Sequence, residues 1–378
     1  MNWERLLDEP SFGLRRAGRY LVADLKGAHH VVSTSARQGG WTTHVRWLVN
    51  HQSCEGAAHH DRHKVITDAG SDGYHDHVCD EVGVPADCTA VMATAASMNY
   101  VAIVREVDGD VAVTAAVTAG VEGNATAAGE PATWRETDTG MQKVVAHTGT
   151  INTMLLTSHP LTPGALARAV VTMTEGKTAA LQRLAVPSKR HIDLATGTGT
   201  DQYCIASPAD GGKALTSASP HLKLGEIIGR ATREATIEAL RWQNGLEASY
   251  TRGLFHALGR FGVREATLFD EIGSLMSEGE LELLKKNSKA AFYEPLVGAA
   301  AHALATVCDR VRYGTIPASV AADAMVQQAA GLAANLSAQA HRWPEFRATL
   351  RPYADGDVTA LVLRALALGW SEKWRTGD

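Results

Sequence analysis

The stretch that decides the fold is Ala146-His147-Thr148-Gly149-Thr150-Ile151-Asn152-Thr153-Met154-Leu155-Leu156. A Gly-Thr step stands directly before a β-branched and apolar run, which predicts a turn followed by a buried strand. Polar residues alternate here with residues suited to a core: Thr148, Thr150, Asn152 and Thr153. A hydroxyl at the start of a buried strand is held in a fixed direction, which is one thing a nucleophile needs; an adjacent base is the other. The same residues also fit a plain core strand in which threonine serves β-propensity.

The composition is that of a folded protein with no electrostatic preference for polyanions. The chain has 378 residues, a formal net charge of -5 and 45% hydrophobic residues. This length predicts one large or two ordinary domains, and the charge gives no basis for nucleic-acid or anionic-membrane binding. No apolar run reaches transmembrane length, the N-terminus lacks a secretory core, and the five scattered cysteines form no CxxC pair. We therefore expect a soluble cytoplasmic protein that partners neither nucleic acid nor membrane, and whether copies of it associate stays open.

The segment of about residues 51–79 is rich in histidine, with His51, His59, His60, His63, His75 and His77. On a helix His59 and His63 would share a face, and on a strand His75 and His77 would do so, which suits zinc. No complete HExxH or CxxC motif accompanies them. We expect a solvated loop and assign no metal ligand, with a zinc site at this segment as the alternative.

Two glycine-rich turns present polar groups before the opening stretch. Arg37-Gln38-Gly39-Gly40 follows a predicted strand, and its paired glycines permit close approach by a ligand or by neighbouring backbone. Tyr100–Val104 and Val111–Val117 predict a hairpin, after which Gly120 and Gly123 bracket a bend that carries Asn124. The amide of Asn124 can donate to a developing oxyanion, or it can satisfy its own turn.

A third turn, Thr196-Gly197-Thr198-Gly199-Thr200-Asp201, leads into another predicted strand. It lacks the lysine of a phosphate-binding loop, and no helix follows it, so a nucleotide site is disfavoured. We expect it instead to offer the Thr198 and Thr200 hydroxyls and the Asp201 carboxylate to the strand at Thr150.

Helices complete the predicted architecture. Thr162 and Pro163 begin one that runs to about Ala185, with Glu175 and Lys177 expected at its surface, and Ser219-Pro220 opens another that Gly245 ends. Beyond Tyr250 the pattern is helical, notably over Ala299–Val311, Ala318–Ala340 and Val358–Trp370. The predicted fold is α+β: layered sheets flanked by helices over residues 1–249, with an αββα sandwich as one arrangement, then a helical region over 250–378.

In their order along the chain, several of these segments resemble the adenosylcobinamide amidohydrolase family (CbiZ). The resemblance spans about residues 28–245 and rests on Ser33-Thr34-Ser35, Arg37-Gln38-Gly39-Gly40, Asn50-His51-Gln52, Val117 to Ala125, Gly149-Thr150-Ile151-Asn152, Leu161 to Ala165, Thr174 to Leu181, Ala195 to Asp201 and Leu224 to Gly229. The sequence departs from the family in two places. Gln38 stands where an asparagine is usual, and the histidine-rich segment looks expanded.

This resemblance implies hydrolysis of the amide that joins aminopropanol to the corrin ring's propionate side chain, which releases adenosylcobyric acid. It implies a corrinoid small molecule as partner and no required cofactor, since the substrate itself carries cobalt. The matched positions implied to contact substrate are Gln38, Gly39, Gly40, Asn50, His51 and Asn152. A metal hydrolase that uses the histidine-rich segment, and a catalytically silent corrinoid-binding protein, remain the alternatives.

The layout from Gly149 to Asp201 also resembles, more weakly, the DmpA aminopeptidase and ornithine acetyltransferase superfamily. Members of that group cleave themselves before a Ser or Thr, which becomes an N-terminal nucleophile. The likeness implies Thr150 as nucleophile, Asn124 as oxyanion donor, and a supporting network of Thr198, Thr200 and Asp201. The new α-amine of Thr150 could then act as its own base.

Overall fold

The computed structural model describes residues 1–53, 59–132, 134–138, 140–143 and 149–375. The chain divides into two compact units, Met1–Leu246 and Glu247–Asp378. The first unit holds the opening stretch apart from residues 146–148, which lie outside the described residues.

The first unit contains a five-stranded sheet in the order β1-β2-β3-β6-β7. Neighbouring strands are antiparallel except β6 and β7, which are parallel. The strands are β1 (Glu4–Asp8), β2 (Phe12–Ala17), β3 (Tyr20–Leu25), β6 (Trp47–Gln52) and β7 (Thr89–Thr94). Because β6 and β7 run in the same direction, both end at the same edge of this sheet.

A six-stranded sheet has the order β5-β4-β15-β13-β9-β8. Among its described strands the one parallel pair is β13 with β15, and a helix connects the two, as parallel strands require. The strands are β4 (His29–Ser33), β5 (Gly40–Thr42), β8 (Ala102–Asp108), β9 (Val111–Ala119), β13 (Ile151–Thr157) and β15 (Gln202–Pro208). The predicted hairpin is thus β8 and β9, and the predicted buried strand is β13, in which every residue is buried.

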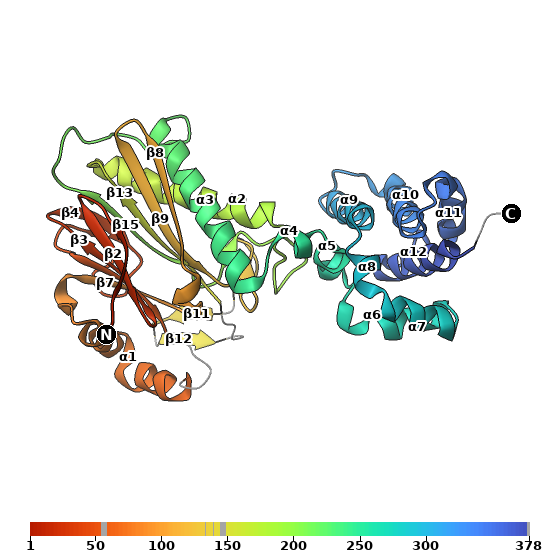
Figure 1. Ribbon diagram of the computed structural model, residues 1–378, viewed down its shortest axis with the longest axis horizontal. Coiled ribbons are helices and arrows are strands. Elements are labelled where there is room, and N and C mark those ends of the chain that lie inside the picture. The colour runs from red at the N-terminus through yellow and green to blue at the C-terminus, as the bar shows by residue number, and fades with distance from the viewer. Residues whose placement is uncertain (54–58, 133, 139, 144–148, 376–378) are drawn as a thin grey trace. The chain divides into compact units, whose positions relative to one another are not determined.

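The two sheets stack face to face with helices on both outer sides (Figure 1). Side chains such as Leu14, Met92 and Met154 form the core between the sheets. Helices α2 (Pro163–Arg183) and α3 (Lys223–Asn244) cover the outer face of the six-stranded sheet, and α1 (His59–Val82) packs on the five-stranded one. The predicted αββα arrangement is confirmed.

The helix boundaries follow the capping residues in most places. Thr162 accepts a hydrogen bond from the Ala165 amide at 3.3 Å, and Gly245 ends α3 with φ 64°. Helix α3 begins later than predicted, because Leu222 N donates to Ser219 O and closes a turn before the helix.

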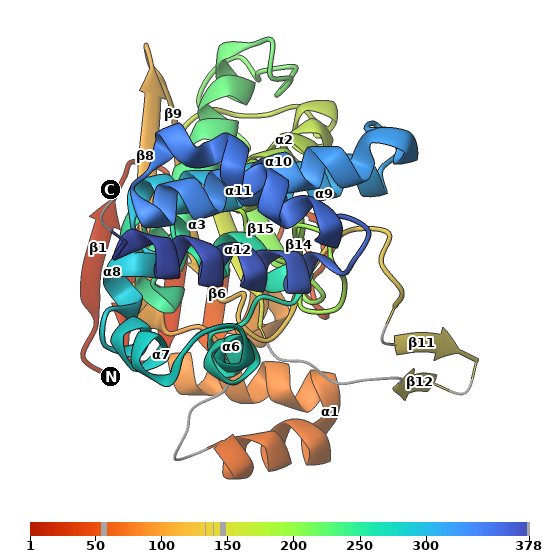
Figure 2. The same ribbon diagram turned by 90° about the vertical axis from the view of Figure 1, so that its right-hand side faces the viewer.

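The predicted loop in the histidine-rich segment is wrong, because this segment forms α1. Gly70 (φ 67°, ψ -174°) interrupts it, and Figure 2 shows the two helical pieces on either side of this break. Val78, Cys79 and Val82 are buried at helical spacing against the five-stranded sheet. These few contacts near its C-terminus anchor the helix, and His75 and His77 lie on it rather than on a strand.

Short elements link the layers around the sheet edges. They are the 3-10 turns η1 (Ala86–Cys88) and η2 (Met98–Tyr100), the pair β10 (Ala125–Thr126) with β14 (Gly197–Thr198), and the pair β11 (Trp134–Thr137) with β12 (Gly140–Lys143). The β10–β14 pair joins the turn after Asn124 to the loop that carries Thr198.

The second unit is helical in the part that the structure describes. Phe292, Phe346 and Trp370 are its largest buried side chains. Its helices are α4 (Ala248–Thr251), α5 (Leu254–Leu258), α6 (Glu265–Ile272), α7 (Glu278–Lys286), α8 (Ser288–Phe292), α9 (Pro295–Arg312), α10 (Ala318–Ser337), α11 (Trp343–Leu350) and α12 (Val358–Lys373), with the 3-10 turns η3 (Gly259–Phe261), η4 (Gly273–Leu275), η5 (Ala340–Arg342) and η6 (Arg351–Tyr353). Across the described residues, no helix has the length and apolar character to cross a bilayer.

Candidate active site

The predicted turns that carry Asn124, Thr150 and Thr200 meet at one edge of the six-stranded sheet. Strand β13 begins at Ile151 beside the end of β9, and β15 begins next to β13 in the same direction. Thr150, Asn124 and Thr200 are therefore carried to the same place by three neighbouring strands. The amide of Gly120 also donates to the carbonyl of Thr150 at 2.9 Å, which fixes the turn against β13.

The carbonyl oxygen of Gly149 accepts two side-chain hydrogen bonds. Asn124 Nδ2 donates to it at 2.9 Å and Thr200 Oγ1 donates to it at 2.8 Å. Two fixed donors on one carbonyl are what stabilises an oxyanion if a nucleophile attacks that carbon. Gly149 itself has φ 139°, and a Cβ there would lie 3.0 Å from Gly120 O, so the backbone conformation requires glycine.

Thr150 is only 4% exposed, and its hydroxyl lies in a polar network. Its Oγ1 donates to the carbonyl of Thr200 at 2.5 Å, and Asn152 Oδ1 is 3.4 Å away. The hydroxyl therefore has a fixed direction beside the carbonyl of the preceding residue.

A chain of buried amides supports Asn152 between the sheets. Asn152 Nδ2 donates to Asn50 Oδ1 at 2.8 Å and to Ala93 O at 3.0 Å, and Asn50 Nδ2 donates to Thr118 Oγ1 at 2.8 Å. Asn50 and Asn152 are 1% and 0% exposed. These two side chains are thus buried and connect to the site through Thr150, and their predicted contact with substrate stays a prediction. A satisfied buried network of this kind fixes geometry because breaking it leaves unpaired polar atoms.

Asp201 ties the Thr/Gly loop to the start of β13. Its carboxylate accepts from the Ile151 amide at 3.0 Å and from Thr198 Oγ1 at 2.6 Å. Lys177 of α2 forms an ion pair with it, and the two side chains are 15% and 18% exposed. The predicted surface position of Lys177 is therefore wrong. A Cβ on Gly197 would lie 2.4 Å from Asp201 Oδ2, so this glycine makes room for the ion pair.

Arg190 belongs to the site although no sequence motif marks it. Its guanidinium donates to Asn124 Oδ1 at 2.8 Å, which directs the Nδ2 end of that amide to Gly149. The residue lies in the segment between α2 and β14, which carries no motif. Only the folded chain places it against the turn at Asn124.

A cavity of about 530 Å³ opens at this edge of the sheets. Residues from both sheets line it: Thr34, Ser53, Ala93, Thr94, Ala95, Gly149, Thr150, Thr200, Asp201 and Gln202. Thr150 and the donor Thr200 thus both face a space that a ligand can enter.

The turn Gln38-Gly39-Gly40 does not line this cavity. Gln38 has φ 58°, and its side-chain oxygen lies 2.6 Å from His44 Nε2. A Cβ on Gly39 would lie 2.1 Å from Ser35 O, so this glycine is required by the turn itself. The role of these three residues in substrate binding stays a prediction.

His51 lies on the opposite face of β6 from Asn50, because neighbouring strand residues point in opposite directions. Its ring stacks on Tyr20 at 4.6 Å and contacts Tyr74 of α1. Burial, and to a lesser extent the positive charge of Arg19, lower the pKa of His51 to about 3. The structure therefore separates His51 from Thr150, and this side chain packs beneath α1.

The other histidines of the segment around residues 51–79 are not gathered into a metal site by the residues described. His75 Nε2 lies 3.0 Å from Ala86 O, and His77 lies 3.7 Å from a carboxylate oxygen of Glu81. The side chains of His59, His60 and His63 lie outside those the structure describes. A zinc site that includes them stays a prediction.

Comparison with known proteins identifies the family of this chain. The model of a family described as adenosylcobinamide amidohydrolase matches residues 6–248. An uncharacterized protein of Methanocaldococcus jannaschii is 36% identical over 183 residues, which cover 46% of this chain and 71% of that protein. Because the family match includes both sheets, α2, α3 and the cavity at Thr150, the chain belongs to the adenosylcobinamide amidohydrolase family.

Proposed function

We propose that this chain hydrolyses the amide between aminopropanol and the corrin propionate of adenosylcobinamide, and releases adenosylcobyric acid for corrinoid salvage. The family supplies the reaction class, and the site supplies the groups that amide hydrolysis needs. The observation that carries the proposal is the pair of donors on the carbonyl next to the Thr150 hydroxyl, at the wall of a cavity.

The same geometry supports cleavage of the chain before Thr150. Thr150 Oγ attacks the carbonyl carbon of Gly149, while Asn124 and Thr200 stabilise the negative charge on the carbonyl oxygen. The hydroxyl proton passes to the Thr150 nitrogen as the C–N bond breaks, which leaves an ester between Gly149 and Thr150 Oγ. Water then hydrolyses the ester. The products are a carboxylate on Gly149 and a free α-amine on Thr150.

The released amine gives Thr150 its own base. It takes the hydroxyl proton as Oγ attacks the substrate amide, and this proton passes to the aminopropanol nitrogen as that group leaves. Water hydrolyses the acyl-threonine ester and frees the corrin carboxylate. Cobalt enters and leaves with the substrate, and the described side chains perform these steps without a resident cofactor.

The test is to incubate the purified full-length protein with adenosylcobinamide and to measure adenosylcobyric acid and aminopropanol by mass spectrometry. We expect both products in equal amounts, and none from Thr150→Ala. The matched control is Thr174→Ala on α2, whose hydroxyl donates only to Val170 O and should leave the rate unchanged.

Two outcomes would contradict the proposal. A shift of the corrin absorption spectrum on binding without either product would indicate a binding protein rather than a hydrolase. Product formation that a chelator abolishes and that Thr150→Ala leaves intact would point to a metal-activated water.

A further inference from the structure

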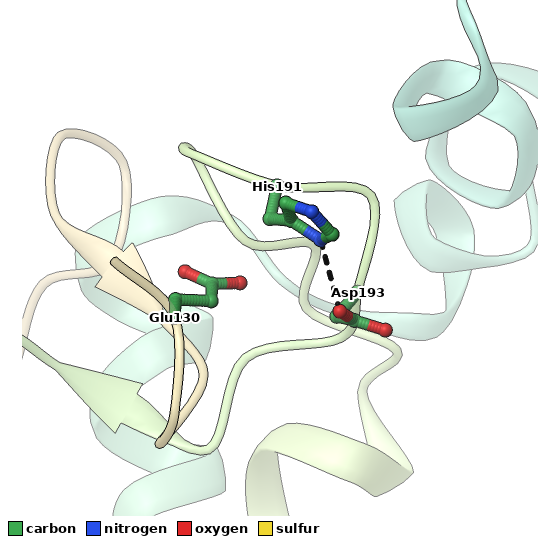
Figure 3. Close-up of side chains that lie close together, drawn as sticks. All are labelled: Glu130, His191 and Asp193. Atoms are coloured by element: carbon green, nitrogen blue, oxygen red, sulfur yellow. Dashed lines mark hydrogen bonds and ion pairs between the residues drawn. The ribbon is translucent and has the colours of Figure 1, made fainter.

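Three side chains with metal-ligating atoms lie together outside the Thr150 cavity. Glu130, His191 and Asp193 each offer one such atom, and these atoms lie within 4.8 Å of one another. Figure 3 shows that Glu130 comes from the segment after β10, while His191 and Asp193 come from the segment between α2 and β14. The cluster therefore joins two segments that are far apart in the sequence.

Only one of the two carboxylate oxygens of Glu130 has hydrogen-bond partners. Its Oε2 accepts from Thr126 Oγ1 at 2.7 Å and from Ser188 Oγ at 2.9 Å. Its Oε1 is buried and has no hydrogen-bond partner. A buried carboxylate oxygen without a partner is costly, and a cation is the partner that relieves this cost most strongly.

The other two side chains contact each other on the loop of residues 188–193. His191 Nδ1 lies 3.0 Å from Asp193 Oδ2. The backbone amide of Ser188 donates to the backbone carbonyl of Asp193 at 2.9 Å, and this hydrogen bond closes the loop of residues 188–193. Two carboxylates with one imidazole form the nitrogen and oxygen set that zinc, manganese and cobalt accept. Metal–ligand distances are about 2.0–2.2 Å, so small side-chain movements bring all three onto one ion.

We propose that Glu130, His191 and Asp193 bind one divalent transition-metal ion, which fastens segment 188–193 to the turn at 126–130. The hydroxyls of Thr126 and Ser188 orient the Glu130 ligand from outside, as groups next to metal ligands commonly do. The ion is structural, because the cluster is not part of the cavity that Thr150 lines.

The location gives this ion a consequence for the active site. Arg190 lies between the ligand His191 and Ser188, and its guanidinium holds Asn124 Oδ1 at 2.8 Å. Lys189 N also donates to Ala125 O at 2.9 Å. Fastening the segment therefore fixes Arg190, and through it the direction of the Asn124 amide. This consequence rests on the proposed function, whereas the metal site itself does not.

Metal binding is tested on the full-length protein after chelator treatment, by titration with Co²⁺ and detection of its visible d–d absorption. We expect saturation at one equivalent and displacement by Zn²⁺. Glu130→Gln and Asp193→Asn should each weaken binding at least about tenfold. The matched control is the double variant His59→Ala/His63→Ala, which removes the competing histidine-rich segment and should retain the signal.

Hydrogen exchange gives a second readout that requires no activity. Zn²⁺ should slow exchange in peptides covering 188–195 in the wild type, and should have no effect there in Glu130→Gln. Equal Co²⁺ binding by the wild type and by Glu130→Gln/His191→Ala/Asp193→Asn would overturn the site.

The coupling to Asn124 has its own test. Chelation should slow cleavage before Thr150 in the wild type and not in Arg190→Ala, which already lacks the link to Asn124. Metal binding at the three residues without any change in the cleavage rate would overturn the coupling. Absence of cleavage altogether would count against the proposed function and leave the binding and exchange results to decide the site.

Discussion

The side-chain amide of Asn124 donates to the carbonyl oxygen of Gly149 at 2.9 Å, and Arg190 holds the other end of the same amide at 2.8 Å. These two contacts determine the orientation of the Asn124 amide. A flipped amide would place its NH₂ group against the guanidinium, donor against donor, and its oxygen against the Gly149 carbonyl, acceptor against acceptor. The peptide bond before Thr150 thus has a fixed donor before any reaction begins. Such pre-organised donors are the main source of oxyanion stabilisation in enzymes.

Replacing Asn124 by aspartate tests this donor. Asn124→Asp keeps the shape of the side chain but places a carboxylate oxygen, which cannot donate, next to Gly149 O. We therefore expect cleavage before Thr150 to slow by about 10²–10³-fold. The rate is measured by gel or mass analysis after expression. Asn335→Asp is the matched control, because Asn335 makes a comparable bond to Leu296 O in the helical unit. Equal cleavage in both variants would exclude Asn124 as the donor.

Gly149→Ala should displace the carbonyl from its two donors. The new Cβ meets Gly120 O at 3.0 Å and the backbone nitrogen of Asn124 at 3.2 Å, in a backbone conformation that alanine disfavours. We expect loss of cleavage and a lower melting temperature. Gly212→Ala shares the positive φ, 128°, but its Cβ meets nothing within 4 Å, so it separates backbone strain from the clash. Identical effects of both changes would show that the contact at Gly120 is unimportant.

The ion pair between Lys177 and Asp201 should contribute to stability as well as to position. Lys177→Met leaves the mostly buried Asp201 carboxylate without its cation, and we expect the free energy of unfolding to fall by about 2 kcal/mol. Lys285→Met removes a much more exposed pair with Glu282 and should cost less than about 0.5 kcal/mol. Urea denaturation measures both. A Lys177→Met protein as stable as Lys285→Met would contradict the role given to this pair.

His51 should make stability depend on pH. Its pKa is about 3 in the folded chain because of burial, and near the ordinary value of about 6.5 when unfolded, so only the unfolded chain gains a proton between these values. Stability therefore falls as the pH drops below about 6.5, by roughly 1 kcal/mol per pH unit from this residue. His51→Phe keeps a ring against Tyr20 without the titration, so its denaturation midpoint should depend less on pH than that of the wild type. Parallel pH dependences would contradict this.

The sequence predicted those elements whose local signals agree with the tertiary structure. Strand β13 and the cap of α2 at Thr162 combine propensity with packing, and both are confirmed. Helix α1 was missed because its polar, glycine-interrupted sequence has little apolar periodicity, and the buried apolar residues among its described side chains are Val78, Cys79 and Val82 near its C-terminus. Local pattern carries no information on such contacts with a distant sheet.

Within the candidate site, the turns carrying Asn124, Thr150 and Thr200 were predicted, because glycine and polar residues before strands are a local signal. Lys177 and Arg190 were not, since each joins the site only through the packing of α2 and of the segment after it. His51, in contrast, was predicted to lie in the site, but its side chain lies on the other face of β6. Its neighbour Asn50 points between the sheets, and a sequence alone does not say which face of a strand meets the site.

The intact mass of the purified wild-type chain tests most directly whether Thr150 becomes an N-terminal nucleophile. We predict two polypeptides, residues 1–149 and 150–378, that remain associated, a single unbroken chain for Thr150→Ala, and slower but detectable cleavage for Thr150→Ser. The contradicting result is an unbroken wild-type chain that nevertheless converts adenosylcobinamide to adenosylcobyric acid.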